Sequence, residues 1–233
     1  MKRFSILALL ILIVSCAKEQ KDLVVKANIK GLKKGTVYLK KAKDSTIITV
    51  DSLVINGNSV FELSSDIESP EMFFLYLDKN SSEDDRIAFF ADKGITEINT
   101  TLKNFVYSAK IKGSTQQATW EEYQAIISRL NGRSLELVKE NFDAQKAGDT
   151  IKLNAIQKEY DGMLKRKYLY TVNFAINNKD SEVSPYLALT EIYNARINLL
   201  DTINNSLTPQ VKASKYGKKL QVFIDDIKKT EKN

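Results

Sequence analysis

The sequence contains no histidine and only one cysteine among its 233 residues. Without histidine there is no imidazole-based catalytic triad and no histidine metal site. A single cysteine allows no internal disulfide, no Cys-x-x-Cys redox pair and no cysteine zinc site. These absences exclude the commonest hydrolytic and redox chemistries. We therefore expect a protein that is not an enzyme and that holds no cofactor and no metal.

Long hydrophobic runs are also scarce, and the only marked one lies at the start of the chain. Residues 4–14 are apolar except for Ser5, follow Met1-Lys2-Arg3, and lead into Ser15-Cys16. A bilayer-spanning helix needs ~20 apolar residues, so this run has the length of a signal-peptide core. The small residue before cysteine resembles a bacterial lipobox. We expect cleavage after residue 15 and lipidation of Cys16; the alternatives are an ordinary signal peptide or a buried segment with a chance cysteine.

The charge balance is basic but not concentrated. The net charge is +6, and basic pairs such as Lys33-Lys34 and Lys218-Lys219 are interleaved with acidic residues. Nucleic-acid binding requires a basic face, so we expect no nucleic-acid partner. A composition of 43% hydrophobic and 27% charged residues is ordinary for a globular protein.

Residues 23–113 show the alternation of β structure. In residues 23–30, Val25, Ala27 and Ile29 fall on one side and polar residues on the other. Further short apolar segments are separated by turn residues. About eight strands at this spacing predict an antiparallel β-sandwich.

Two turns in this region carry specific predictions. Asn56-Gly57 is a strong signal for a hairpin. The turn Asp92-Lys93-Gly94 predicts a second hairpin, formed by residues 87–90 and 95–102. The last strand is expected at residues 107–111.

From residue 114 onward the period becomes helical. Ser114, with Gln117 three residues later, predicts a capped helix start, and Gly148-Asp149 predicts the end of one helix and the cap of the next. Ser184-Pro185 and Thr208-Pro209 predict two further starts. The expected fold class is α+β: a sandwich followed by a bundle of about four helices.

The expected domain organisation has four parts. Residues 1–15 form the lipoprotein signal peptide and residues 16–22 a lipidated tether. Residues 23–113 form the β-sandwich domain, and residues 114–233 the α-helical domain.

A series of short motifs, in this order and spacing, resembles a known family. The motifs are Gly31-Leu32, Val37-Tyr38-Leu39, Val50-Asp51-Ser52, Asn56-Gly57, Lys112-Gly113-Ser114, Ala147-Gly148-Asp149, Phe174-Ala175-Ile176-Asn177-Asn178, Ser184-Pro185-Tyr186 and Leu200-Asp201. They resemble the N-terminal domain of unknown function (DUF4369 type) of thioredoxin-like (AhpC/TSA, TlpA-type) lipoproteins of Bacteroidota. The resemblance extends over residues 23–227.

The resemblance implies a location more clearly than an activity. In longer relatives, a thioredoxin fold with a Cys-x-x-Cys pair follows the region that is matched here. Residues 227–233 end in lysines, and we expect no such domain, so thiol-disulfide exchange does not carry over. Lipoproteins of these bacteria usually go to the outer membrane, which we expect here, with the leaflet left open.

The candidate binding residues lie in the segment after residue 184. Glu191 and Asn194 are three residues apart and would share a helix face. With Arg196, and together with Asn177 and Asn178, they form a candidate polar patch. Tyr186 and Tyr193 are candidates to line a groove, because tyrosine suits half-buried surfaces. The alternatives are that the tyrosines belong to the core and that the polar groups bond to helix ends and loops.

One acidic segment is a candidate calcium site. Ser82-Glu83-Asp84-Asp85 offers oxygen ligands but lacks the alternating acid spacing and the glycine of a dedicated loop. We interpret it as a solvated loop.

These observations favour a lipid-anchored, non-enzymatic binding or scaffolding module, whose partners are the membrane and a protein of the cell envelope. Two alternatives remain. The chain could assist a separate thioredoxin-like redox protein, or a pair of carboxylates in the cleft between its halves could catalyse hydrolysis.

Overall fold

The computed structural model describes residues 21–44, 46–78 and 85–230. The predicted leader and Cys16 lie outside the described residues, as do three of the four residues of the acidic segment 82–85. The α+β fold class is confirmed: within these described ranges, eight strands form two sheets, and six α-helices follow them. Among the described residues, no helix combines the length and the apolar character needed to cross a bilayer.

The first sheet contains β4 (Val60–Ser65), β1 (Leu23–Lys30), β7 (Gly94–Thr101) and β8 (Lys110–Lys112) in this order. The second contains β3 (Thr46–Asn56), β2 (Lys34–Lys43), β5 (Glu71–Tyr76) and β6 (Arg86–Ala91). Their inner faces enclose an apolar core. It includes Val25, Ala27 and Ile29, which confirms the predicted alternation of β1.

Two predicted hairpins are wrong, although their turns exist. The strands on either side of Asn56-Gly57, β3 and β4, lie in different sheets, and so do β6 and β7 on either side of Asp92-Lys93-Gly94. β7 pairs in parallel with β1, so the first sheet is mixed and not purely antiparallel. A turn signal reports a chain reversal, but the partner of each strand depends on distant packing. The last strand is also shorter than predicted.

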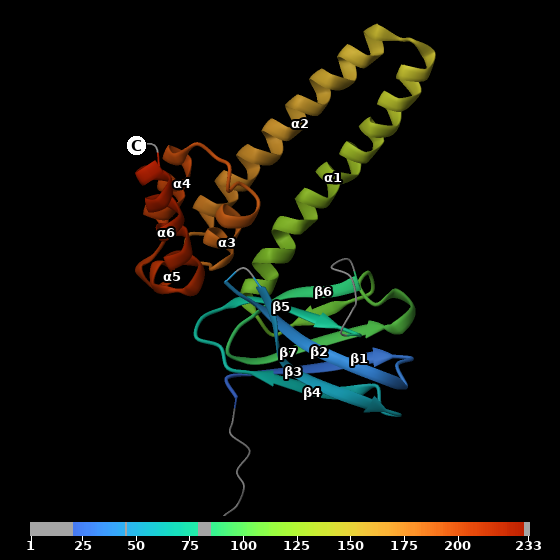
Figure 1. The fold of residues 1–233 in the computed structure, drawn as a ribbon, viewed down its shortest axis with the longest axis vertical. Coiled ribbons are helices and arrows are strands. Elements are labelled where there is room, and N and C mark those ends of the chain that lie inside the picture. Colours follow the sequence, from blue (N-terminus) through green and yellow to red (C-terminus); the bar gives the residue numbers. More distant parts are fainter. Residues whose placement is uncertain (1–20, 45, 79–84, 231–233) are drawn as a thin grey trace, which may run out of the picture.

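The six helices are α1 (Thr115–Ala147), α2 (Thr150–Asn177), α3 (Val183–Thr190), α4 (Ile197–Ser206), α5 (Pro209–Ala213) and α6 (Lys215–Thr230). Figure 1 shows α1 and α2 as a long antiparallel hairpin that rises from the sandwich, while α3 to α6 form a compact group beside its base. α1 and α2 have the predicted caps. The Ser114 side chain accepts from the Gln117 N–H, and Gly148, at φ 68°, ends α1. Asp149 caps α2.

The sequence predicts about four helices, and the described part of the structure has six. The difference arises around the two predicted starts at Ser184-Pro185 and Thr208-Pro209. Thr208 caps the short α5 as predicted, but the chain turns at Ser214 before α6 begins. Ser184 does not cap α3. Its hydroxyl donates to the carbonyl oxygen of Ala175 in α2 at 2.7 Å, which fixes α3 against α2 instead.

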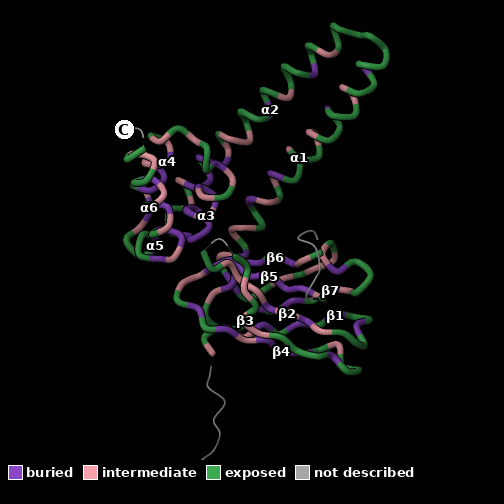
Figure 2. The backbone as a smooth tube through the Cα atoms, in the orientation of Figure 1, coloured by how far each residue is buried: buried purple, intermediate pink, exposed green. Residues whose placement is uncertain are grey.

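The helices pack on the outer face of the second sheet through an aromatic cluster. Its members are Phe74, Tyr76, Phe90, Trp120, Tyr123, Tyr170, Phe174, Tyr186 and Tyr216. β5 is buried along its whole length because Phe73 and Leu75 face the sandwich core while Met72, Phe74 and Tyr76 face the helices. A strand covered on both sides loses the simple alternation of exposed and buried residues. Figure 2 shows this buried zone where the base of the hairpin meets the sheet.

Candidate functional site

The predicted binding residues do not form one patch on one helix. α3 ends at Thr190 and α4 begins at Ile197, so Glu191, Tyr193, Asn194 and Arg196 lie in the connecting turns, and their expected common helix face is wrong. Ile192 is buried in the core of the small helices. Arg196 adopts an extended ψ of 135° before α4 begins.

Tyr186 lies away from Tyr193, inside the aromatic cluster. Its ring makes edge contacts with Phe90 at 5.2 Å and with Tyr216 at 5.1 Å between centroids. Burial raises the pKa of Tyr186 to about 12. Tyr193 is largely exposed. Glu191 contacts Lys167 of α2 at 3.7 Å, so the turn is held against the base of the hairpin.

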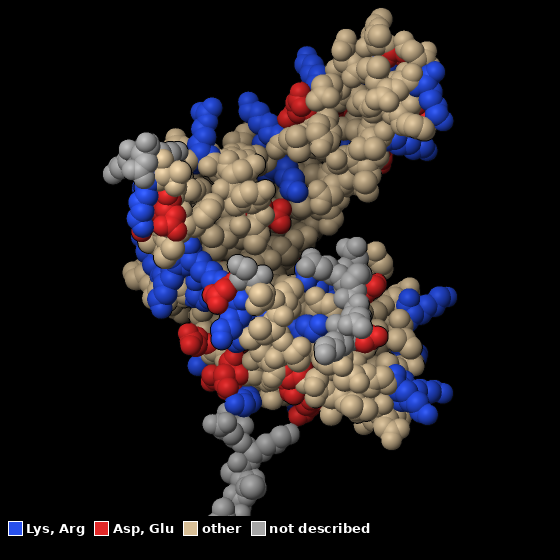
Figure 3. Space-filling model, viewed as in Figure 1, with Lys and Arg blue, Asp and Glu red and all other residues tan. Residues whose placement is uncertain are grey.

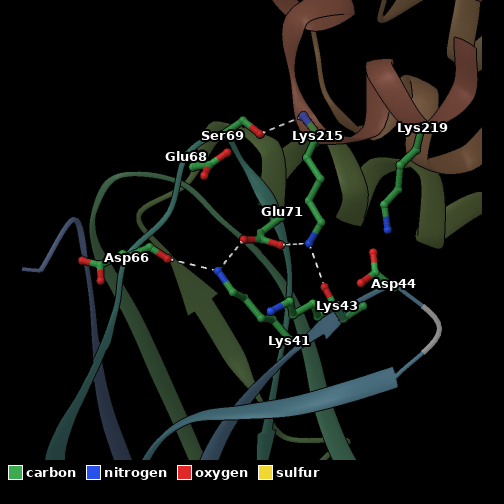
Figure 4. A pocket seen from close by; sticks show the side chains of 10 residues that line it. Lys41, Lys43, Asp44, Asp66, Glu68, Ser69, Glu71, Lys215 and Lys219 are labelled. Atoms are coloured by element: carbon green, nitrogen blue, oxygen red, sulfur yellow. Dashed lines mark hydrogen bonds and ion pairs between the residues drawn. The ribbon is translucent and has the colours of Figure 1, made fainter. Parts of the chain in front are cut away.

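A hollow of about 340 Å³ lies where the second sheet meets α6 (Figure 4). Its centre is Glu71, whose side chain is only 4% exposed. One carboxylate oxygen accepts from the Lys41 amine at 2.9 Å, and the other accepts from the Lys215 amine. Both amines also donate to backbone carbonyl oxygens, those of Asp66 and Ala42. The network joins β2, β5 and α6.

The arrangement around Glu71 suits a structural clamp better than acid–base chemistry. A general base needs an oxygen that is free to take a proton from a substrate, and both oxygens of Glu71 are occupied by ammonium groups. The buried carboxyl whose pKa is raised, Glu182, does not line this hollow; burial causes that shift. Among the described residues, no group of three or more acidic or cysteine side chains is placed to hold a metal ion.

The second candidate is the surface of the α1–α2 hairpin. The 33 residues of α1 give it a length of about 50 Å. Past Leu130, its buried residues pack on α2 alone, through a seam that includes Leu137 and Ala144 of α1 and Ile156 and Met163 of α2. This outer part of α1 extends about 25 Å. In Figure 1 it projects away from the rest of the molecule.

The two sides of this seam differ in charge. On one side Arg133 binds three carboxylates: Glu136 at 3.0 Å, Glu140 at 2.8 Å and, from α2, Glu159 at 2.8 Å. The hydrogen bond from Arg133 lowers the pKa of Glu159. We call this side the charged flank. It ties α1 to α2 across the seam.

The opposite side, which we call the apolar flank, presents mainly apolar and amide side chains: Asn131, Val138, Phe142 and Gln145 of α1, with Gln157 and Leu164 of α2. It also carries the carboxylate of Asp161, which accepts from Gln157 at 2.9 Å. Two shallow hollows run along it, of about 190 and 230 Å³. Val138 is 61% exposed and Phe142 55% exposed, and Leu135, at 73%, extends the same stripe through its spacing of three and seven residues.

The sequence does not indicate this flank directly, because its apolar residues have the pattern of a bundle core. Leu137, Val138 and Phe142 follow a helical period, and such a pattern usually marks a buried face. Leu137 is buried, but Val138 and Phe142 are not. The sequence does contain one indirect indication of this flank. The outer part of α1 has more apolar residues than a single contact with α2 can bury.

Comparison with known proteins identifies the sandwich. Residues 23–120 match the family described as "Domain of unknown function (DUF4369)", a match that covers the two sheets and the first turns of α1. The predicted N-terminal domain of this type is confirmed. No curated protein and no solved structure matches the chain. The association with thioredoxin-like lipoproteins stays a prediction.

Proposed function

We propose, starting from the DUF4369 domain of residues 23–120 and the hairpin that follows it, that the protein is a lipid-anchored scaffolding module of the cell envelope. Its working surface is the apolar flank of the α1–α2 hairpin. The observation that carries this proposal is the pair of exposed apolar side chains, Val138 and Phe142, on an arm that extends beyond the globular body.

The position of Lys21, the first residue that the structure describes, supports the anchoring part of the proposal. The described chain begins at Lys21, next to the sandwich, where the Lys21 amine contacts Asp66 at 2.8 Å. In Figure 1 the hairpin leaves the molecule on the other side. Four residues lie between Cys16 and Lys21, and the five steps from one Cα atom to the next allow a reach of at most about 18 Å. With lipid on Cys16, the sandwich lies near the membrane and the hairpin points away from it.

The surface charges are compatible with this orientation. On the face shown in Figure 3, lysine and acidic side chains gather over α5, α6 and the neighbouring part of the sandwich, whereas the visible face of the hairpin carries scattered charges between larger uncharged areas. Mixed charge keeps a tethered protein soluble. A large exposed apolar patch on a protein surface usually marks a site of interaction with a partner.

The tether makes a modest surface sufficient for binding. Confinement to one membrane raises the effective concentration of partners that share it. A weak contact through a narrow helical flank then reaches useful occupancy. Stable anchoring requires more than one acyl chain, and multiple acylation of Cys16 provides it.

In-cell photo-crosslinking tests the proposal. A photoreactive amino acid replaces Val138 in the full chain, and the control chain carries it at Lys139, one position along the same helix but turned by about 100°. We expect an adduct with an envelope protein from position 138, little from position 139, and loss of the adduct when Cys16→Ser is added. Equal labelling at both positions, or none, would overturn the assignment of the flank.

A further inference from the structure

Three segments of the chain meet at the end of the sandwich where β1 finishes. In the register of the first sheet, Lys30 at the end of β1 lies beside Thr101 at the end of β7, and β4 begins next to Asn28. The N–H of Gly57, in the turn before β4, donates to the carbonyl oxygen of Lys33 at 2.8 Å. The turn after β1, the turn before β4 and the segment after β7 therefore share one surface.

This surface, which we call the basic end, carries lysines without acidic residues. Its four lysines are Lys30, Lys33, Lys34 and Lys103, and residues 30–36, 56–60 and 101–109 contain no aspartate or glutamate. All four lysines are exposed, and none of them forms an ion pair in the part of the chain that the structure describes. In Figure 3 basic side chains protrude at this end of the sandwich, toward which β1 points in Figure 1. The lysines come from separate segments of the sequence, so only the fold concentrates them.

The charge at the other end of β1 is balanced. There the Lys93 amine pairs with the carboxylate of Asp22 at 3.2 Å. The acidic residues Asp78 and Asp85 flank β5 and β6, which lie on the other side of β2 from β3. The lysines of the basic end therefore repel one another without a counter-charge from their own segments. An anionic surface outside the chain relieves this repulsion.

Apolar side chains project among the lysines of the basic end. Tyr107 and Leu102 are exposed in the segment after β7, and Val60 is exposed at the start of β4. A tyrosine ring suits a boundary between lipid and water, because one end of the side chain is apolar and the other is polar. Lysine likewise places its methylene chain against apolar material while its amine stays in water. Amines for lipid phosphates and apolar side chains for the layer beneath them are the two components of an interfacial membrane contact.

We propose that the basic end binds the surface of an anionic lipid bilayer, as a second contact beside the acyl chains on Cys16. The choice of a bilayer as the occupant rests on the proposed anchor, which keeps the sandwich within reach of lipid. β1 has eight residues and spans about 23 Å. The tether and the basic end therefore contact the membrane at opposite ends of the sandwich.

The second contact fixes the direction of the hairpin. A protein that is held only by a flexible tether turns freely about it, whereas contacts at both ends of β1 hold this strand roughly parallel to the membrane. In Figure 1, β1 runs across the view and the hairpin rises away from it. With β1 held in this way, the hairpin projects from the membrane and presents its apolar flank to partners.

Binding to vesicles tests the inference without the anchor. The chain of residues 16–233 with Cys16→Ser contains every residue that the structure describes, but it has no acyl chain and no apolar leader. Its partition coefficient is measured by sedimentation with vesicles of phosphatidylcholine alone and of phosphatidylcholine with one-third phosphatidylglycerol. We expect binding to the anionic vesicles that weakens as salt is added, and at least ten-fold weaker binding to the neutral vesicles.

Two triple variants of equal net charge separate the basic end from the overall charge of the protein. One carries Lys33→Gln, Lys34→Gln and Lys103→Gln, and the matched control carries Lys152→Gln, Lys158→Gln and Lys165→Gln at exposed positions of α2. A lysine near an anionic surface strengthens binding roughly five-fold, so the first variant should bind about a hundred-fold more weakly. The control should bind within about two-fold of the parent chain, because α2 projects away from the membrane and salt screens distant charges.

The outcomes separate this inference from the function on which it rests. Equal binding of the two triple variants, equal binding to neutral and anionic vesicles, or no binding to either would overturn the inference. Tighter binding to polygalacturonate, a soluble anionic polysaccharide, than to the anionic vesicles would overturn the bilayer as the occupant. The chain in this test has no lipid, so none of these results affects the proposed anchor. Conversely, an unmodified thiol at Cys16 of the native protein would overturn the anchor and leave the vesicle measurement standing.

Discussion

The backbone N–H of Met72 in β5 donates to the hydroxyl oxygen of Tyr216 in α6 at 3.0 Å. The two residues are far apart in the sequence, and their contact attaches the last helix to the outer face of the second sheet. Tyr216 is buried, and its ring also contacts Phe90 and Tyr186. This relationship is the basis of the first prediction.

Tyr216→Phe keeps the ring but leaves the Met72 N–H without an acceptor. An unsatisfied buried polar group costs about 1–3 kcal/mol, so we expect the free energy of unfolding to fall by that amount. Equilibrium urea denaturation measures the change. Tyr193→Phe is the control, because Tyr193 is exposed, and its effect should stay within about 0.5 kcal/mol. Equal effects of the two variants would contradict the assignment.

The buried tyrosines predict a loss of stability at high pH. Burial raises the pKa of Tyr186 to about 12 and raises the pKa values of Tyr123 and Tyr216 well above their usual value. A tyrosine whose pKa is higher in the folded than in the unfolded protein stabilises the fold fully below about pH 10, the usual pKa of the unfolded side chain. This stabilisation is lost as the pH rises from about 10 through the pKa of the folded state. We expect cooperative unfolding between pH 10 and about 12.

Circular dichroism and tyrosinate absorbance, recorded together against pH, check this expectation. The buried tyrosines should ionise only as the ellipticity is lost. Tyr107→Phe, at a position that is 96% exposed, should leave the unfolding midpoint unchanged. Full ionisation of every tyrosine near pH 10 with the fold intact would contradict the packing of the aromatic cluster.

Glu71→Gln removes the charge that holds Lys41 and Lys215 together. Two ammonium groups would then lie close to each other without a counter-charge, and breaking a buried ion pair in this way costs about 3–5 kcal/mol. Thermal or urea unfolding measures the loss. Glu62→Gln, which breaks an exposed pair with Lys26, should cost less than about 1 kcal/mol. A small effect at Glu71 would show that the clamp does not hold α6 to the sheet.

We expect substitution by alanine to change the stability of the protein in opposite directions at two glycines. Gly113 precedes α1 at φ 114°, and a Cβ there would collide with the carbonyl oxygen of Ile95. Gly113→Ala should therefore cost more than 2 kcal/mol, since such a site combines backbone strain with overpacking. Gly132 lies within α1 and faces open space, so Gly132→Ala should stabilise the chain by about 0.5–1 kcal/mol. Calorimetry should show melting temperatures that move in opposite directions.

Local patterns predicted the elements well but their assembly less well. The alternation of Val25, Ala27 and Ile29 and the caps at Ser114 and Asp149 depend on neighbouring residues, and the structure has them. The parallel pairing of β1 with β7 depends on packing between distant segments, and no local pattern indicates it.

The surface features were harder to predict for a similar reason. Glu191 to Arg196 continue a helical pattern in the sequence, but in the structure they form the turns between α3 and α4. The Glu71 clamp joins residues 30 and 144 positions apart, so sequence spacing gave no hint of it. Val138 and Phe142 have the period of core residues, and only the three-dimensional arrangement shows that more than half of each side chain is exposed.

Mass spectrometry of the N-terminal peptide of the native protein tests the lipid anchor, on which the proposed orientation of the hairpin depends. We expect the chain to begin at Cys16 and this residue to carry acyl chains. A peptide that retains residues 1–15, or a Cys16 with an unmodified thiol, would contradict it.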